Sequence, residues 1–422
     1  MKIPPLLKSL ILSKDPSFVF SSNPNLDEHV EVGPFTVSEI EKIYYELMEN
    51  DFYDEEYNLT SWKPEPYELM ANILCDVFKL EDNKSPDIID VGCGVGYLVE
   101  SFRRRGIEAG GIEFSKQIYN RISEETKKYV HFFNEHNFYN KFKFSGLKLV
   151  LSLEVYEHLP LSLIQKNLEK LFKEHTGWVF LTIPSIGIDP YNGRSIFNES
   201  SPFRIDDMNQ NKLFSYLAML NGTPGGGHIT LASIRWWTDF FFINNWVRDF
   251  LMESKLEDYN HILKAYRWCP YILKKLNSED VTFSGGWLPY LKSNDEYGNH
   301  GQFNLSNAEL LFAYNRNKKL FLSFEIFDPN TNQFPLYITL RFWTLSICSE
   351  NAKIDYTLLQ TRTETIEYNK SNSYELILEL NLRIEDSVKI KVEVNTPMFW
   401  KHDSKKDKDI SVGYIFKHCT LI

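Results

Sequence analysis

The chain has 422 residues, 43% of them apolar and 15% aromatic, so it can build two or three folded domains and lacks the composition of a disordered protein. Its net charge of −11 argues against a protein that grips nucleic-acid phosphates, because such contacts require a basic surface. Five scattered cysteines with no CxxC pair exclude a disulfide framework and a zinc ribbon. No apolar run is long enough to span a bilayer, and we expect a soluble, cytoplasmic protein.

Helical spacing of apolar residues predicts helices over residues 36–51 and 65–80, and we assign residues 1–64 to an N-terminal helical extension. From residue 87 onward, short apolar strands alternate with amphipathic helices. This alternation is typical of a parallel sheet with helices on both faces, which is a Rossmann-like, doubly wound α/β fold. The predicted strands are "DIIDV", "IEAGGIEF", "YVHFF", "LKLVLSLEV" and "GWVFLTIP", and the helices are "YLVESFRRRG", "SKQIYNRISEETKK" and "LSLIQKNLEKLFKEH".

The pattern breaks over residues 184–228, which are rich in Gly, Pro, Asn and Ser and which we interpret as an insertion. Helices are predicted over 235–246 and 253–277. After residue 281 the apolar period changes to two, which predicts an all-β domain, most simply a sandwich. The expected domains are thus residues 1–64, the α/β domain at 65–280 and the β-sandwich at 281–422.

A glycine-rich loop joins the first predicted strand of the α/β domain to the helix that follows. "DVGCGVG" contains Asp90, Gly92, Gly94 and Gly96, and the second strand ends in Glu113. Glycines allow a ligand to approach the backbone, and the helix N-terminus offers free N–H groups. An acid at the end of the second strand suits a ribose diol. A purely structural turn and a nicotinamide site are the alternatives, and the GxGxG spacing differs from the GxGxxG of dinucleotide folds.

Together these residues resemble the class I S-adenosylmethionine-dependent methyltransferases over roughly residues 65–250. The resemblance implies that the three glycines line the methionine and ribose part of the cofactor and that Asp90 orients the loop or meets the amino group. It also implies that Glu113 holds the ribose hydroxyls. For the rest of the cofactor site it implies Phe114 beside the adenine, Asn134 or Glu135 near the adenine amine, and Ser152 at the end of the fourth strand.

The fourth strand runs into "SLEVYEHLP", which places Glu154, Glu157 and His158 at the mouth of the expected site. Three interpretations stay open. In the first, the carboxylates only stabilise the N-terminus of the next helix through its dipole. His158, with the two glutamates beside it, is alternatively a general base that takes a proton from a substrate hydroxyl. In the third interpretation the cluster binds a divalent metal.

The metal interpretation rests on the E-x-x-E-H pattern, which resembles ubiquinone-pathway O-methyltransferases and plant small-RNA 2′-O-methyltransferases. That resemblance implies a later histidine ahead of an aromatic-rich helix, and His228 in "GGGHITLASIRWW" holds this place. The implied ligand set is Glu154, Glu157, His158 and His228, with a divalent ion such as Mg²⁺. A bound metal lowers the pKa of a substrate hydroxyl and orients it for attack.

The expected acceptor is a sugar hydroxyl in a cell-surface glycan. Tyr191, Arg194 and Arg204 in the insertion are candidates for substrate contacts. The C-terminal region resembles β-sandwich modules of polysaccharide-assembly enzymes, since Gly286 and Trp287 match their "GW" pair while Gln302 and Phe303 replace the usual Arg-Trp. Association with glycan-assembly enzymes or with a second copy is compatible with this interpretation. The rival functions are a small-molecule or quinone O-methyltransferase and a glycan-binding protein with a degenerate methyltransferase fold.

Overall fold

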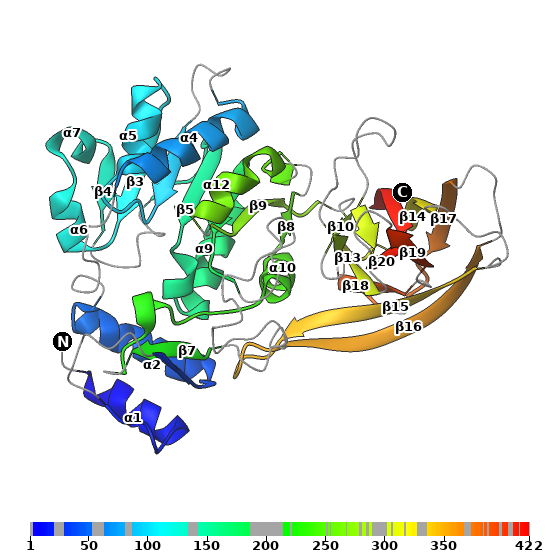
Figure 1. Ribbon diagram of the computed structural model, residues 1–422, viewed down its shortest axis with the longest axis horizontal. Coiled ribbons are helices and arrows are strands. Elements are labelled where there is room, and N and C mark those ends of the chain that lie inside the picture. The colour runs from blue at the N-terminus through cyan, green and yellow to red at the C-terminus, as the bar shows by residue number, and fades with distance from the viewer. Residues whose placement is uncertain are drawn as a thin grey trace. The chain divides into compact units, whose positions relative to one another are not determined.

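The computed structural model describes most of the chain as two compact units (Figure 1). Unit 1 contains Met1–Trp237, Lys255–Lys275 and Cys348–Lys353, and unit 2 contains Thr238–Ser254, Leu276–Ile347 and Ile354–Ile422. The structure describes the whole chain except residues 1–2, 21–28, 53–62, 81–86, 134–141, 186–213, 220–221, 250–251, 254, 267, 278–280, 284–286, 289–301, 305–306, 316–317, 327–335, 367–372, 383, 386–387, 396–398, 404–407, 413 and 422. The boundaries expected at residues 64 and 280 stay a prediction.

A seven-stranded sheet carries the predicted alternation of strands and helices. Its strand order is β4-β3-β2-β5-β6-β9-β8, and its first five strands are parallel while β9 runs antiparallel to β6. The strands are β2 (Ile88–Val91), β3 (Ala109–Glu113), β4 (Val130–Phe132), β5 (Leu149–Leu153), β6 (Trp178–Thr182), β8 (Trp246–Arg248) and β9 (Pro270–Lys275). All four residues of β2 are buried, as a central parallel strand requires. This confirms the Rossmann-like fold.

The helices of unit 1 begin where the sequence offers caps. Thr36 and Glu39 form a capping box at the start of α2, and Gly96 with φ 81° precedes α5. The helix predicted over "SKQIYNRISEETKK" is two helices, because Ile122 is extended and Ser123 caps a new start. The helices are α1 (Pro5–Lys14), α2 (Val37–Glu49), α4 (Glu65–Phe78), α5 (Tyr97–Arg104), α6 (Lys116–Arg121), α7 (Glu124–Lys127), α9 (Leu161–Glu174) and α12 (Asn260–Ala265), and a small sheet pairs β1 (His29–Val32) with β7 (Tyr216–Met219). Helix α10 (Ile234–Ile243) has most of its residues in unit 2.

The prediction of one helix over 253–277 is wrong for its second half. α12 ends at Ala265, and β9 (Pro270–Lys275) follows as a strand paired with β6. The stretch "CPYILKK" is apolar enough for either structure. The stretch forms a strand because it pairs with the edge of β6. Local periodicity does not reveal this long-range pairing.

Unit 2 contains the predicted β-sandwich. Two five-stranded antiparallel sheets have the orders β10-β13-β18-β15-β16 and β11-β12-β21-β14-β17, and a hairpin pairs β19 with β20. The core between the sheets takes alternate residues from both, such as Leu340 and Val392 from one and Leu322 and Leu378 from the other. The strands are β10 (Val281–Phe283), β11 (Trp287–Leu288), β12 (Gln302–Asn304), β13 (Asn307–Ala313), β14 (Lys319–Ile326), β15 (Leu336–Ile347), β16 (Ile354–Ile366), β17 (Ser373–Glu379), β18 (Lys389–Asn395), β19 (Phe399–Asp403), β20 (Lys408–Val412) and β21 (Tyr414–Leu421).

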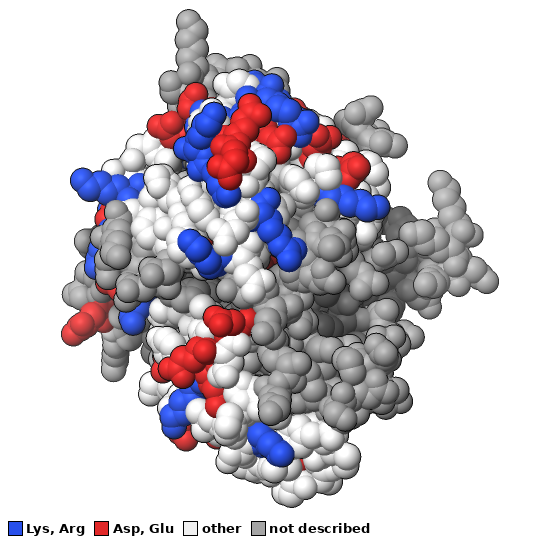
Figure 2. Space-filling model, turned by 90° about the vertical axis from the view of Figure 1, so that its left-hand side faces the viewer, with Lys and Arg blue, Asp and Glu red and all other residues white. Residues whose placement is uncertain are grey.

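The charged surface of unit 1 mixes both signs. On the face that Figure 2 presents, Lys and Arg side chains lie among Asp and Glu side chains. The basic run 103–105 is paired: Arg103 bonds Glu108 at 2.5 Å and Arg104 bonds Glu68 at 2.6 Å. Among the described helices, none is long and apolar enough to cross a bilayer.

Candidate active site

The glycine loop lies at the carboxyl end of β2, where the sequence analysis places the cofactor. Gly92, Gly94 and Gly96 have φ values of 79°, 58° and 81°, a region that favours glycine. A Cβ on Gly92 would lie 2.5 Å from Cγ2 of Val155. The loop is therefore tied to the segment that follows β5, and any side chain at Gly92 would force the two apart.

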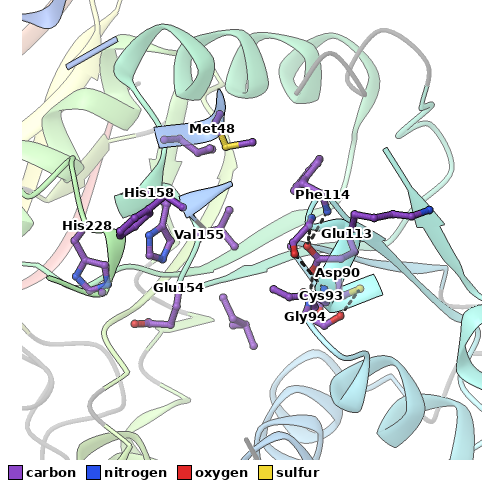
Figure 3. A pocket seen from close by; sticks show the side chains of 18 of the residues that line it. Met48, Asp90, Cys93, Gly94, Glu113, Phe114, Glu154, Val155, His158 and His228 are labelled. Atoms are coloured by element: carbon purple, nitrogen blue, oxygen red, sulfur yellow. Dashed lines mark hydrogen bonds between the residues drawn. The ribbon is translucent and has the colours of Figure 1, made fainter. Parts of the chain in front are cut away.

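A cavity of about 610 Å³ opens beside this loop. The loop residues Gly92, Cys93 and Gly94 form one side of it together with Asp90 and Glu113, while Glu154, His158 and His228 form another (Figure 3). The remaining lining residues are Tyr44, Met48, Asp51, Phe52, Tyr67, Phe114, Ser115, Lys116, Ile118, Phe132, Leu153, Val155, Leu159, Gly226 and Trp268. A volume of this size is typical of small-molecule and cofactor sites.

Glu113 is held at the end of β3 by backbone donors. One carboxylate oxygen accepts from the N–H of Gly94 at 2.8 Å, and the other accepts from Phe114 at 2.7 Å and Ser115 at 2.8 Å. These bonds are drawn in Figure 3. They orient the carboxylate at the cavity wall and connect it to the glycine loop.

Asp90 is a buried carboxylate at the end of β2. Its Oδ1 has no hydrogen-bond partner among the described residues. Burial raises the pKa of its carboxyl to about 7, and the Glu113 carboxylate adds to the rise. Tyr67 of α4 also lines the cavity, and burial followed by the charges of Asp90 and Glu154 raises the pKa of its hydroxyl. A cationic group at this end of the cavity would relieve the cost of the Asp90 charge.

Glu157, His158 and His228 come together at the other side of the cavity. One ligand atom from each lies within 4.8 Å of the other two. Oε1 of Glu157 is 3.6 Å from Nε2 of His158 and 3.9 Å from Nε2 of His228, and the two imidazole centroids are 4.9 Å apart. Figure 3 shows the two rings side by side. The structure thus juxtaposes residues that are 70 positions apart in the sequence.

The local fold explains how these three side chains are held. Residues 156–158 form a short 3-10 turn after β5, and the backbone oxygen of Glu157 accepts from the N–H groups of Ile229 at 2.8 Å and Thr230 at 2.9 Å. Gly226, with φ 62°, allows the turn that precedes His228. These two backbone hydrogen bonds therefore connect the segment after the insertion to the segment after β5.

The electrostatics of the cluster favour neutral imidazoles. Burial lowers the pKa of His158 to about 4, against backbone hydrogen bonds that raise it, and burial with the neighbouring His158 lowers the pKa of His228 to about 3. Glu157 is fully buried, and both of its carboxylate oxygens lack a hydrogen-bond partner among the described residues. Burial and the charge of Glu154 raise the pKa of Glu157 well above its usual range.

Glu154 does not join this group. Its backbone lies at φ 55°, and its N–H donates to the carbonyl of Thr182 at 2.9 Å. Burial raises the pKa of its carboxyl to about 7, against a hydrogen bond from Thr182. Figure 3 shows its side chain on the same side of the cavity as the histidines, across from the glycine loop. Of the four expected ligands, the described structure therefore clusters three.

Several other expected site residues lie elsewhere or outside the described residues. Ser152 is buried and donates to the carbonyl of Val91 at 3.1 Å, so it links β5 to β2 and does not line the cavity. Gly96 also lies outside the lining, and a Cβ there would meet Thr126 at 2.8 Å. The residues that fall outside the described part of the chain are Asn134, Glu135, Tyr191, Arg194, Arg204 and Gly286.

Several residues that line the cavity were not expected from the sequence. Tyr44 and Met48 come from α2, and Phe52 follows it, in the region expected to be only an extension. Trp268 comes from the segment after α12. The amphipathic pattern of α2 indicated a buried face, but only the tertiary structure shows which part of that face borders the site.

A model of the methyltransferase domain family matches residues 65–238. Residues 65–238 are therefore similar to a methyltransferase domain. The glycine loop, Glu113 and the histidine pair all lie within its bounds. The domain covers less than half of the 422 residues, and unit 2 has most of its residues outside it. A search of curated proteins found no match.

Solved methyltransferase structures resemble parts of the chain at low identity. The mitomycin 7-O-methyltransferase MmcR is 11% identical with a TM-score of 0.33, and the match covers 49% of this chain and 55% of that one. A methyltransferase from Archaeoglobus fulgidus is 13% identical with a TM-score of 0.31, covering 50% and 94%. The methyltransferase domain of a bacterial CtHen1 is 21% identical with a TM-score of 0.25, covering 32% and 75%. At these scores the structures add nothing to the family match.

Proposed function

We propose that the protein transfers the methyl group of S-adenosylmethionine to a hydroxyl group, and that Glu157, His158 and His228 activate that hydroxyl. The observation that carries the proposal is the convergence of these three side chains beside the cofactor cavity. A free alcohol is a poor nucleophile, and a group that removes its proton or lowers its pKa makes in-line attack on the sulfonium methyl possible.

The three side chains fit a divalent metal. Two neutral imidazoles and one carboxylate are a common donor set, and the orphaned oxygens of Glu157 gain a partner when a cation binds. Imidazole donors favour ions such as Mn²⁺, Co²⁺, Fe²⁺ or Zn²⁺ over Mg²⁺. Such an ion, when bound, would lower the pKa of the acceptor hydroxyl and orient it.

The chain's own residues then have distinct roles. Glu113 and the glycine loop hold and orient the cofactor, and Asp90 offers a negative charge to its cationic part. His158 and His228 line the cavity and meet the acceptor side, whereas Glu157 lies behind them and outside the lining. A histidine with a pKa of about 4 is a weak proton acceptor at neutral pH, which favours metal binding over direct general-base catalysis by His158.

The acceptor that we propose is a sugar hydroxyl of a glycan, in a cytoplasmic step before export. The β-sandwich in unit 2 and its sequence resemblance to polysaccharide-assembly modules support this choice. Association with glycan-assembly enzymes or self-association belongs to the same proposal. A small-molecule or quinone acceptor is the second candidate, and the wall of Met48, Phe52 and Trp268 favours it. The intact glycine loop and Glu113 argue against a degenerate, purely glycan-binding protein.

The test combines cofactor binding, methyl transfer and metal removal. Titration calorimetry with S-adenosylmethionine measures cofactor binding, and transfer of a labelled methyl group to nucleotide sugars, short glycans and quinols identifies the acceptor. We expect His158→Ala to abolish turnover while cofactor binding persists. His131→Ala is the matched control, because His131 is exposed on β4 and does not line the cavity.

Each outcome decides one part of the proposal. Normal turnover in His158→Ala would exclude a role for the cluster in activation. Full activity after exhaustive EDTA treatment would exclude the metal, whereas activity that EDTA removes and Mn²⁺ restores supports it. Failure to bind S-adenosylmethionine would contradict the proposed reaction as a whole.

A further inference from the structure

A buried cluster of reactive side chains lies in unit 2 and has no part in the methyl-transfer proposal. Lys391 of β18 is 2% exposed, Asp239 of α10 is 0% exposed and Glu309 of β13 is 7% exposed. Lysine, aspartate and glutamate are rarely buried to this degree. The strand pattern of "KIKVEV" predicts that Lys391 faces away from the sandwich core, and α10 covers it there.

The contacts within this Lys–Asp–Glu cluster are short. Nζ of Lys391 is 2.6 Å from Oδ2 of Asp239 and 2.9 Å from Oε2 of Glu309. The hydroxyl of Tyr356 donates to the same Oδ2 at 2.7 Å, and the Lys391 Nζ lies 4.6 Å from the centre of the Tyr356 ring. Leu311, the cross-strand partner of Lys391, is fully buried beside Phe242 and Val247, so one side of the cluster borders apolar side chains.

We propose that Lys391 and Asp239 form an intramolecular amide (isopeptide) bond, with Glu309 as the proton-transfer residue. An amine lies against a carboxyl group, a second carboxylate touches the amine, and a phenol touches the carboxyl oxygen. This is the set of groups that condensation of an amine with an acid requires.

The steps balance without any other reactant. A proton of the Lys391 ammonium moves to Oδ2 of Asp239, which leaves a neutral amine and a carboxylic acid. Nζ attacks Cγ, and Glu309 accepts the proton that Nζ loses. Glu309 returns that proton to the Oδ2 hydroxyl, the Cγ–Oδ2 bond breaks, and one water leaves. A C–N bond replaces a C–O bond, nothing is oxidised or reduced, and the Tyr356 hydroxyl assists the departing oxygen.

Burial supplies the driving force. In water the equilibrium favours the ionised amine and acid over the amide, because both ions are hydrated. A buried site removes that hydration, so the separated charges lose their main stabilisation and the neutral pair that reacts becomes accessible. The product amide has no net charge and keeps a hydrogen-bonding N–H and C=O. Expulsion of the product water from apolar surroundings opposes the reverse reaction.

A second buried pair in the same unit provides a contrast. Arg248 donates to Glu253 through Nε at 3.0 Å and Nη2 at 2.7 Å. A guanidinium stays protonated in proteins, so Arg248 offers no neutral amine that could attack a carboxyl group. Of these two pairs, only the pair of Lys391 and Asp239 therefore contains a nucleophile.

The experiment measures the intact mass of the denatured full-length chain. We expect wild-type protein to weigh one water molecule less than its sequence, and tryptic digestion to give one branched peptide that contains both residues 239 and 391. Lys391→Arg and Glu309→Gln should both show the full sequence mass. Lys389→Arg is the matched control, because Lys389 lies on the same strand outside the cluster, and it should keep the mass loss.

The wild-type measurement decides the proposal by itself, whether or not the variants fold. Folded wild-type protein with the full sequence mass and separate linear peptides would overturn it. Loss of water in Lys391→Arg would show that the bond lies elsewhere, and loss of water in Glu309→Gln would overturn the role of Glu309. None of these results depends on methyltransferase activity, so the two proposals fail independently.

Discussion

Asp90→Asn tests whether the buried carboxylate of the glycine loop meets the cationic part of the cofactor. In the free protein, burial and then Glu113 raise the pKa of Asp90 from its ordinary value to about 7. The native state therefore binds the Asp90 proton more tightly than the unfolded state does. The contribution to stability is full at pH values below about 4, falls as pH rises, and levels off above pH 7.

The size of this effect follows from the shift. A rise of about three pKa units corresponds to about 4 kcal/mol in total, of which about 2.5 kcal/mol falls between pH 5 and pH 8. Asparagine has the same shape and does not titrate, so Asp90→Asn should remove this part of the pH slope. Urea unfolding of unit 1, followed by Trp fluorescence at both pH values, measures the difference. Glu100→Gln on the exposed side of α5 is the control that should keep the wild-type slope.

The same carboxyl links cofactor binding to pH. A positive group beside Asp90 lowers its pKa, so binding at pH 6 should release up to one proton, and the affinity should rise about tenfold per pH unit up to pH 7. Calorimetry in two buffers of different ionisation enthalpy measures the proton count, which should fall toward zero in Asp90→Asn. If wild type and variant release equal numbers of protons, the cationic part of the cofactor does not meet Asp90.

Two further substitutions test the framework around these sites. Gly92→Ala should weaken S-adenosylmethionine binding at least about tenfold, because the added Cβ would lie 2.5 Å from Val155. Gly106→Ala is the control, since Gly106 also has a positive φ of 75° but open space around it, and this variant should bind normally. Equal affinities of the two variants would contradict this reasoning. Arg248→Met should lower the free energy of unfolding of unit 2 by about 3–5 kcal/mol, because it removes both hydrogen bonds that the guanidinium donates to the buried Glu253 carboxylate. A loss below about 1 kcal/mol in urea denaturation would show that the pair is solvated.

The cofactor half of the site could be predicted because its information is local. Asp90, the glycines and Glu113 lie at the ends of two adjacent parallel strands, and each strand is short and apolar enough to recognise. Chain order then fixes which ends meet. The structure places Asp90, Gly92, Gly94, Glu113 and Phe114 around the cavity, and Gly96 lies outside the lining.

The acceptor half could be predicted only in part. His228 was reached through a family resemblance, since no periodicity links it to His158 across 70 residues. Tyr44, Met48 and Trp268 were not predicted to line the cavity. Tertiary packing brings α2 and the segment after α12 to the cavity, and local sequence patterns do not reveal that packing. The burial of Lys391 is a similar case, because strand alternation shows which face a residue takes but not what covers that face.

The two ends of the cavity present the same physical problem. Oδ1 of Asp90 at one end of the cavity, and Oε1 of Glu154 and both oxygens of Glu157 at the other, are buried without a hydrogen-bond partner among the described residues. Burying an unpaired carboxylate costs several kcal/mol, by general estimates about 3–5 for one that has lost its partner. A fold optimised only for stability would replace such groups by apolar ones.

Positive charge supplied by the ligands would lower the free-energy cost of burying these carboxylates. The cofactor carries a cationic sulfonium and an ammonium, which suit Asp90, and a divalent ion suits Glu157 between its two histidines. The stabilisation that each ligand brings should then exceed what its contact area gives, and the two should be additive if they act at separate ends. The thermal shift with S-adenosylmethionine and Mn²⁺ together should equal the sum of the shifts that each ligand gives alone. A combined shift no larger than one of the single shifts would mean that both ligands neutralise the same carboxylate.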